Sequence, residues 1–282
     1  MSVVAAPAAR KPIPTRAILP FLGLTFLITW GLMGFYILLP ARAAALLGPL
    51  SGTHPVFFLA TWSPAIAGLA VTALYGGRSA PRALLSRLLI WRIPWVWPLF
   101  ILVVLPGVFV AGALMKGGPV LAPLPPGGAG AVVATLFTML ALGPVEELGW
   151  RGVLQPLLQR RVAPFWAGAA VGATWGLWHL PAFFLAGTVF ADWNFVPFFV
   201  GNVVLAILVT PILNGSGGSL LWPMLFHWQL INPLWPDAQP FDTWILLAVT
   251  AIVAWISRAD LFTRGGVTDV LPAPKTRPAG PG

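Results

Sequence analysis

The chain has 282 residues, of which 58% are hydrophobic and only 8% are charged. A soluble domain carries about 25% charged residues, so this composition excludes a water-soluble protein and indicates a polytopic membrane protein. The net charge of +9 does not indicate a nucleic-acid partner, because the basic residues gather in a few loops, and the absence of cysteine excludes disulfides, thiolate metal sites and a cysteine nucleophile.

In chain order, residues 1–16 are rich in alanine and proline and predict a disordered basic arm. The first apolar span is expected at 17–40. At about 24 residues it is longer than the apolar part of a secretory signal, although Ala41-Arg42-Ala43 resembles a cleavage site and leaves a signal peptide as the alternative. Most of the later spans are near the roughly 20 residues that a bilayer requires, and we expect them at 55–75, 95–115, 129–149, 164–186, 195–213, 218–232 and 243–258.

The predicted fold class is therefore all-α, a membrane protein with about eight transmembrane helices. Residues 17–260 are expected to form one transmembrane domain, whose core lies at about 130–235. The proline-rich residues 261–282 are expected to form a flexible tail.

The basic residues predict the orientation. They precede the first span, separate the second from the third, separate the fourth from the fifth, and follow the eighth. These four groups hold fourteen of the sixteen basic residues, and only Arg42 and Lys116 fall on the other side. Because cytoplasmic loops are enriched in lysine and arginine, we predict a multi-pass protein of the cell's inner (plasma) membrane with both termini in the cytoplasm.

Few ionisable side chains are expected at membrane depth. Glu146 and Glu147 are the only glutamates of the chain, and His179 and His227 are two of its three histidines. Charged groups at this depth are costly and by default indicate a functional site. If the helix of the fourth span continues beyond Arg151, both histidines and Glu146 lie about 14–21 Å from the cytoplasmic ends of their helices and can meet.

Helical spacing assigns different neighbours to the two glutamates. Glu147 and Arg151 are four residues apart and can pair, whereas Glu146 points about 100° away. A structural ion pair is the simpler alternative. Burial disfavours an ionised carboxylate and a nearby arginine favours it, so we expect Arg151 to keep a glutamate charged. Trp175 and His179 are also four residues apart, which places the indole against the imidazole.

These residues resemble the motifs of the CPBP intramembrane proteases, which include CAAX prenyl endopeptidases and bacteriocin-processing or immunity homologues (the Abi group). The first family motif, Glu-Glu-x-x-x-Arg, is met by Glu146, Glu147 and Arg151. The second, Phe-x-x-x-His, is met with tryptophan at its first position by Trp175 and His179. The third motif, His-x-x-x-Asn/Asp, is not fully met. His227 is followed at that spacing by Ile231, and Asn232 comes one position later.

The resemblance implies an endopeptidase that acts within the bilayer and is reached from the cytoplasmic side. It implies catalytic roles for Glu146, Glu147, His179, His227 and Asn232, supported by Arg151 and Trp175. Because the third motif departs, Gln229 or Asn202 could take the place of Asn232. Two mechanisms are open: Glu146 activates water, which we favour, or a divalent metal such as zinc does so on Glu146, His179 and His227.

Two other functions stay open beside a peptidase that acts on membrane-bound or prenylated peptides. One is a proton-coupled transporter that uses Glu146 and His179 as a relay. The other is a non-catalytic immunity or scaffold protein, which the displaced asparagine of the third motif would favour. In each case the partner is the lipid bilayer, and none of the three needs nucleic acid.

Overall fold

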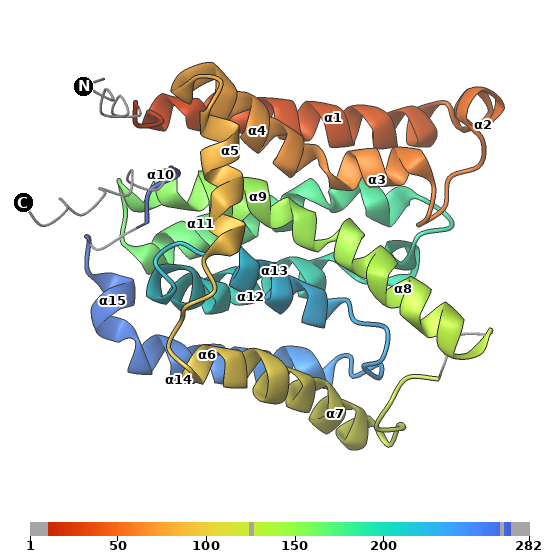
Figure 1. Cartoon of the computed structure of the whole chain (residues 1–282). Coiled ribbons are helices and arrows are strands. Elements are labelled where there is room, and N and C mark those ends of the chain that lie inside the picture. Colours follow the sequence, from red (N-terminus) through yellow and green to blue (C-terminus); the bar gives the residue numbers. More distant parts are fainter. Residues whose placement is uncertain (1–10, 124–126, 266–267, 272–282) are drawn as a thin grey trace, which may run out of the picture.

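The computed structural model describes residues 11–123, 127–265 and 268–271, which form helices and no strand. The first half of the bundle (Figure 1) consists of η1 (Thr15–Ala17), α1 (Ile18–Leu38), α2 (Pro40–Leu47), α3 (Pro55–Thr61), α4 (Ser63–Gly76), α5 (Ala80–Leu85), η2 (Ser86–Leu89), α6 (Val96–Leu99), η3 (Phe100–Val104) and α7 (Leu105–Lys116). The second half consists of α8 (Gly128–Leu142), η4 (Pro144–Glu146), α9 (Glu147–Gly149), η5 (Trp150–Leu154), α10 (Gln155–Gln159), α11 (Pro164–Trp178), η6 (Leu180–Phe184), η7 (Val189–Asp192), α12 (Phe195–Gly215), α13 (Leu221–Leu230), α14 (Phe241–Ile256) and α15 (Arg258–Phe262).

The predicted all-α membrane fold is confirmed, but the count of eight spans is not. Four helical stretches of the described chain are long and apolar enough to cross a bilayer, and a fifth is formed if α3 and α4, which meet at 52°, count as one bent span. The remaining three predicted segments contain α11, α13 and α14, which have 15, 10 and 16 residues. Their apolar sequences predict spans, but their helices are shorter than a bilayer requires.

Figure 1 shows that successive predicted segments run in alternating directions between the two ends of the bundle. The segments around η1, α5, α10 and α15, which carry most of the basic residues, lie toward the left end. Helix α2, with Arg42, and the end of α7, with Lys116, lie at the right end. The predicted division of charge is therefore a division between two ends of the bundle. That the left end faces the cytoplasm stays a prediction.

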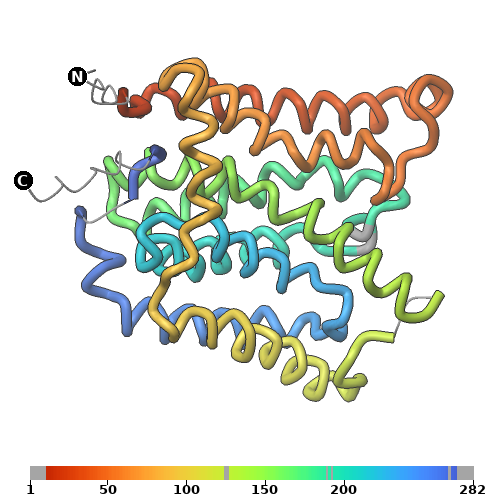
Figure 2. The backbone as a smooth tube through the Cα atoms, viewed as in Figure 1, coloured from red at the N-terminus to blue at the C-terminus, as the bar shows by residue number. Residues whose placement is uncertain are grey.

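The bundle has three layers, formed by α1, α3 and α4, by α8–α13, and by α6, α7 and α14 (Figure 1). One apolar core joins the first two layers and includes Phe21, Trp150 and Val171. A second joins the last two layers and includes Leu105 and Leu208. The chain from α8 to α10 runs through the middle layer (Figure 2). Residues 146–157 on it are buried, whereas α8 has no buried residue.

The helix of the fourth span continues past Arg151, as predicted, but with two irregular turns. Pro144 begins a 3₁₀ turn, and residues 150–154 form a π-helix. Pro156 has no N–H group and therefore cannot bond to the carbonyl group four residues before it, that of Gly152. The guanidinium group of Arg87 replaces this donor: it binds the carbonyl oxygen of Gly152 at 2.8 Å and that of Arg151 at 3.4 Å.

Arg87 corrects one expectation, because it was grouped with the loop charges that set orientation. Its side chain is buried and also donates to the carbonyl oxygens of Gly218 (2.6 Å) and Val270 (3.2 Å). Burial lowers the pKa of Arg87 to about 9, so the group remains protonated at neutral pH. Arg87 therefore ties four chain segments together at the left end of the bundle.

The predicted arm and tail extend beyond the described residues, because residues 1–10 and 272–282 lie outside them. The described part of each packs on the bundle. Ile13 from the predicted arm and Val270 and Leu271 from the predicted tail are buried in the same apolar core. The helical domain therefore includes residues on both sides of the predicted boundaries.

Helices α4 and α9 approach closely at Gly68 and Gly149. A Cβ atom at residue 149 would lie 2.2 Å from the carbonyl oxygen of Pro64, and small residues allow such contact between membrane helices. Gly149→Ala is therefore expected to lower the free energy of unfolding by at least the 1–3 kcal/mol typical of overpacking. Thermal unfolding in detergent measures this. Gly107→Ala is the control, since a Cβ there meets nothing within 4 Å, and an equal loss in both variants would contradict the close contact.

Candidate active site

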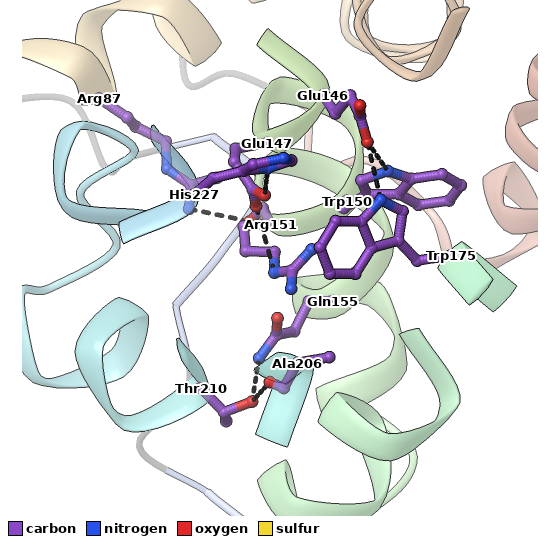
Figure 3. A network of polar contacts seen from close by, with 10 residues as sticks. All are labelled: Arg87, Glu146, Glu147, Trp150, Arg151, Gln155, Trp175, Ala206, Thr210 and His227. Carbon is purple, nitrogen blue, oxygen red and sulfur yellow. Dashed lines mark hydrogen bonds and ion pairs between the residues drawn. The ribbon is translucent and has the colours of Figure 1, made fainter. Parts of the chain in front are cut away.

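The two neighbouring glutamates point to different partners, as their spacing predicts (Figure 3). Oε2 of Glu146 accepts hydrogen bonds from the indole N–H groups of Trp175, at 2.7 Å, and Trp150, at 3.3 Å. The side chain of Glu146 is buried. Because both indoles bind the same oxygen, Oε1 remains available to a water molecule or a substrate.

Glu147 lies between Arg151 and His227. Its Oε2 is 3.2 Å from Nε of Arg151, which confirms the predicted ion pair. Its Oε1 is 2.7 Å from Nδ1 of His227, so a hydrogen bond to the same carboxylate joins α13 to α9 (Figure 3). All three side chains are buried. Glu147 therefore holds both a guanidinium group and the imidazole in place.

One ring nitrogen of His227 makes no hydrogen bond within the part of the chain that the structure describes. With Nδ1 bound to Glu147, Nε2 points toward Gly143, where a Cβ atom would lie only 2.7 Å from it. A side chain at residue 143 would thus push His227 out of position. The glycine before Pro144 provides the space in which Nε2 can meet a ligand.

His179 follows the last residue of α11 and is held by that helix. Its Nδ1 is 2.8 Å from the carbonyl oxygen of Trp175. A carbonyl oxygen can only accept, so Nδ1 carries the proton and Nε2 of the neutral ring is an acceptor. Phe190 and Phe198 lie against the ring, with centroid distances of 5.5 and 5.0 Å. The packing fixes the direction in which Nε2 points.

Trp175 connects these groups. Besides its bond to Glu146, its ring centroid lies 5.7 Å from that of His179 and 5.2 Å from that of His227. The guanidinium carbon of Arg151 lies 5.2 Å from its ring, within range of a cation–π contact. A phenylalanine could make the ring contacts but not the hydrogen bond.

These side chains surround one end of a cavity of about 920 Å³. Of the predicted site residues, Glu146, Trp175, His179 and His227 line it, and so does Asn202. Glu147, Arg151 and Asn232 do not. Glu147 and Arg151 instead contact the lining residues His227 and Trp175.

The structure does not bring Asn232 to this cavity. Helix α13 ends at Leu230, and the side chain of Asn232 closes the following turn: Oδ1 accepts from the backbone N–H of Leu234, and Nδ2 donates to Oε1 of Gln229, both at 3.0 Å. Gln229 in turn donates to the carbonyl oxygen of Ile101 at 3.1 Å. Both side chains are used in holding the turn.

Asn202, which was named from the sequence as an alternative to Asn232, lines the cavity. Its Nδ2 donates to the carbonyl oxygen of Phe198 at 2.8 Å, while its buried Oδ1 has no hydrogen-bond partner within the described chain. Gly172 and Gly176 of α11 bring α12 this close, since a Cβ atom at Gly172 would lie 2.7 Å from the carbonyl oxygen of Asn202. A buried polar atom without a partner indicates a ligand or water site.

Several buried polar residues that extend this site along the helix were not predicted from the sequence. Glu147, Arg151, Gln155 and Gln159 follow one another at intervals of four and are all buried. Gln155 donates to Oγ1 of Thr210 at 2.9 Å, as Figure 3 shows. The signal was the four-residue spacing after Arg151, which extends a polar stripe along one helix face. The same spacing links Trp150 to Glu146 and could have found that contact.

The predicted metal ligands Glu146, His179 and His227 all line the cavity but do not converge on one point. Among the residues that the structure describes, no three His, Asp or Glu side chains are placed to hold a metal ion. Oε2 of Glu146 faces two indoles, and His227 is turned by Glu147. This arrangement does not fit a bound divalent ion, and we assign no step to one. Chelation remains the test.

Comparison with known proteins identifies the segment that carries this site. Residues 128–231 match the family model of the type II CAAX prenyl endopeptidase Rce1-like proteins. This segment is similar to the Rce1-like proteins. The resemblance predicted from the motifs is thereby confirmed. A curated relative, CAAX prenyl protease 2 of Methanococcus maripaludis, is 28% identical over 145 residues, which are 48% of this chain and 54% of the relative. The chain thus spans about half the length of that relative.

The Rce1-like segment contains every predicted site residue except Asn232, since the match ends at residue 231. Asn202 lies inside it. Glu146, Trp175, His179, Asn202 and His227 therefore lie both in the matched segment and at the cavity. Together with the apolar helices, the match confirms a multi-pass membrane protein.

Proposed function

We propose that this protein is an intramembrane endopeptidase of the plasma membrane that hydrolyses membrane-associated or lipid-modified peptides. The observation that carries the proposal is the placement of Glu146, a buried carboxylate, in a cavity that also presents two imidazoles and Asn202. The matching family and the relative are both named as CAAX prenyl proteases, which is the same class of reaction.

In the proposed mechanism Glu146 is the general base. Its Oε1 takes a proton from a water molecule, the water oxygen attacks the peptide carbonyl carbon, and the C=O bond becomes an oxyanion. His179 can accept the second hydrogen of the water through Nε2 and orient it. When the tetrahedral intermediate collapses, the C–N bond breaks and protonated Glu146 returns its proton to the leaving amine.

His227 and Asn202 are proposed to stabilise the oxyanion. Because Nδ1 of His227 donates to the carboxylate of Glu147, Nε2 can also donate to the oxyanion when the ring is the doubly protonated imidazolium. Nδ2 of Asn202 has a second hydrogen beyond the one bound to Phe198. Donors that are held in place before the reaction need no rearrangement when charge develops. Glu147 supports this by fixing Nδ1 of His227.

The walls of the cavity suit an apolar substrate. Met33, Phe57, Phe109 and Leu246 line it away from the polar end. Pockets of this size and composition accept lipid-like or hydrophobic ligands, with a few polar groups giving orientation. A peptide next to a membrane anchor or a lipid group therefore fits better than a charged soluble peptide.

Cleavage of synthetic peptides tests the proposal. The purified protein is incubated in ¹⁸O-labelled water with membrane-spanning and prenylated peptides, with and without a chelator, and products are read by mass spectrometry. We expect internal cleavage with one ¹⁸O in the new carboxylate, absent with the Glu146→Gln protein as control for contaminating proteases. Cleavage lost on chelation would instead assign the water to a metal ion.

The polar stripe is the observation that favours proton-coupled transport as a second function, because Gln155 and Gln159 keep buried amide atoms without partners in the described chain. Proton flux into liposomes driven by a solute, without any peptide cleavage, would support it. If the protein showed no cleavage and no flux, the remaining function would be that of a non-catalytic immunity or scaffold protein.

Trp175→Phe, which restores the family's residue, is expected to lower kcat by about tenfold or more with little change in KM. The change removes a hydrogen bond to a charged group, worth about 1.5–3 kcal/mol, and each 1.36 kcal/mol is about tenfold in rate. Trp222→Phe is the matched control, because its indole N–H binds a carbonyl oxygen of Trp91 far from the cavity. Equal kinetics of the two variants would exclude a role of the indole N–H.

Asn202→Leu and Asn232→Leu are expected to act differently. Loss of an oxyanion donor at residue 202 should reduce kcat by about 10²-fold. Loss of the Asn232 side chain leaves the N–H of Leu234 without its partner and should cost about 1–3 kcal/mol of stability with little effect on kcat in folded protein. Steady-state kinetics and thermal unfolding separate the two effects. A larger loss of kcat at 232 would return the catalytic role to that residue.

A further inference from the structure

The cavity opens to the surface at one end of the bundle, away from the motif residues. Away from Glu146, its lining includes the exposed residues Thr53, Trp193, Asn194 and Gln239. They lie between α2 and α3, between η7 and α12, and between α13 and α14, the connections at the right end in Figure 1. We call these four residues the mouth.

The opposite end of the site is closed. Every residue from Glu146 to Leu157 is buried. Arg87 seals this side by binding backbone carbonyl groups of the same stretch. The buried site helix and Arg87 therefore lie between Glu146 and the left end of the bundle.

The closed end is also the basic end. The described residues flanking η1, α5, α10 and α15 supply almost all of the arginines, whereas the mouth end has Arg42 and Lys116, and the latter is paired with Asp237. The side chains of the mouth itself carry no charge. Because cytoplasmic loops are enriched in lysine and arginine, the basic end is predicted to face the cytoplasm and the mouth to face away from it.

We propose that the substrate enters from the non-cytoplasmic side of the membrane. This rests on the proposed function and specifies its substrate class: a polypeptide with an apolar segment in the bilayer whose cleavage site is exposed on the outer face. A cytoplasmic prenylated tail would have to cross the bilayer to reach this mouth. The entry side implied by the family resemblance and the orientation predicted from the charges therefore cannot both hold, and the charge distribution favours outer entry.

The cysteine-free sequence allows a direct test. Asn194→Cys and Thr53→Cys place a single thiol at the mouth, and Ser79→Cys places one at the exposed loop before α5. Intact spheroplasts are treated with a membrane-impermeant maleimide. We expect both mouth thiols to be labelled from outside and residue 79 to be labelled only after permeabilisation. The reverse pattern, or mouth thiols that label from neither side, would overturn the proposal.

A second measurement links entry to activity. A bulky maleimide on residue 194 is expected to reduce peptide cleavage by about tenfold or more, whereas the same label on residue 79 should leave it unchanged. Unchanged cleavage with a blocked mouth would show that peptides enter elsewhere. The labelling pattern requires no catalysis, so absence of cleavage in every protein would reject the proposed function while the entry side is still decided.

Discussion

Glu146→Gln is expected to reduce peptide cleavage by about 10²–10⁴-fold, the range that a positioned general base contributes. Glutamine has nearly the same volume, and its amide oxygen can still accept from the indoles of Trp150 and Trp175. The fold should therefore be unchanged. Initial rates with one peptide, together with thermal unfolding of both proteins, measure the two effects.

Two further variants define what is lost. Glu146→Asp keeps the charge but withdraws the carboxylate by about one bond length, and a displacement of about 1 Å can cost 10²-fold. Asp260→Asn makes the same carboxylate-to-amide change on exposed α15 and should have no effect. If Glu146→Gln kept a rate within a few-fold of the Asp260→Asn protein, Glu146 could not be the base.

The local chemistry of the site could be predicted because it depends on neighbours along one helix. Residues four apart share a face, and this is enough to pair Glu147 with Arg151 and to separate Glu146 from both. The third motif could not be interpreted in this way. Helix α13 ends at Leu230 and Ile231 has φ of −112°, so counting helical positions from His227 gives no direction for Asn232.

Contacts between distant segments were outside the reach of spacing rules. Asn202 meets the site because glycines of α11 let α12 approach. Buried Arg87 donates to a carbonyl group that Pro156 cannot bond. Neither fact is visible in hydropathy. The number of spans was uncertain for a similar reason, since apolar helices as short as α13 are buried between others rather than exposed to lipid.

Arg151→Leu is expected to lower the free energy of unfolding by about 3–5 kcal/mol, because the buried carboxylate of Glu147 keeps its contact to His227 but loses the guanidinium group that pairs its charge. Lys116→Gln is the control: it breaks an ion pair whose side chains are 42% and 72% exposed, and such pairs contribute at most about 1 kcal/mol. Unfolding in detergent, followed by tryptophan fluorescence, gives both values. Similar losses in the two variants would contradict a buried ion pair.

The double variant Glu147→Leu/Arg151→Leu separates stability from function. Removing both charges avoids an unpaired ion, and apolar replacements of buried pairs are often neutral or stabilising, so most of the lost stability should return. Cleavage should not return, since Nδ1 of His227 loses the carboxylate that lies 2.7 Å away and the ring is free to turn. If the double variant cleaved peptides at the wild-type rate, the Glu147 contact to His227 would be structural only, and Glu146 would need no oriented imidazole on α13.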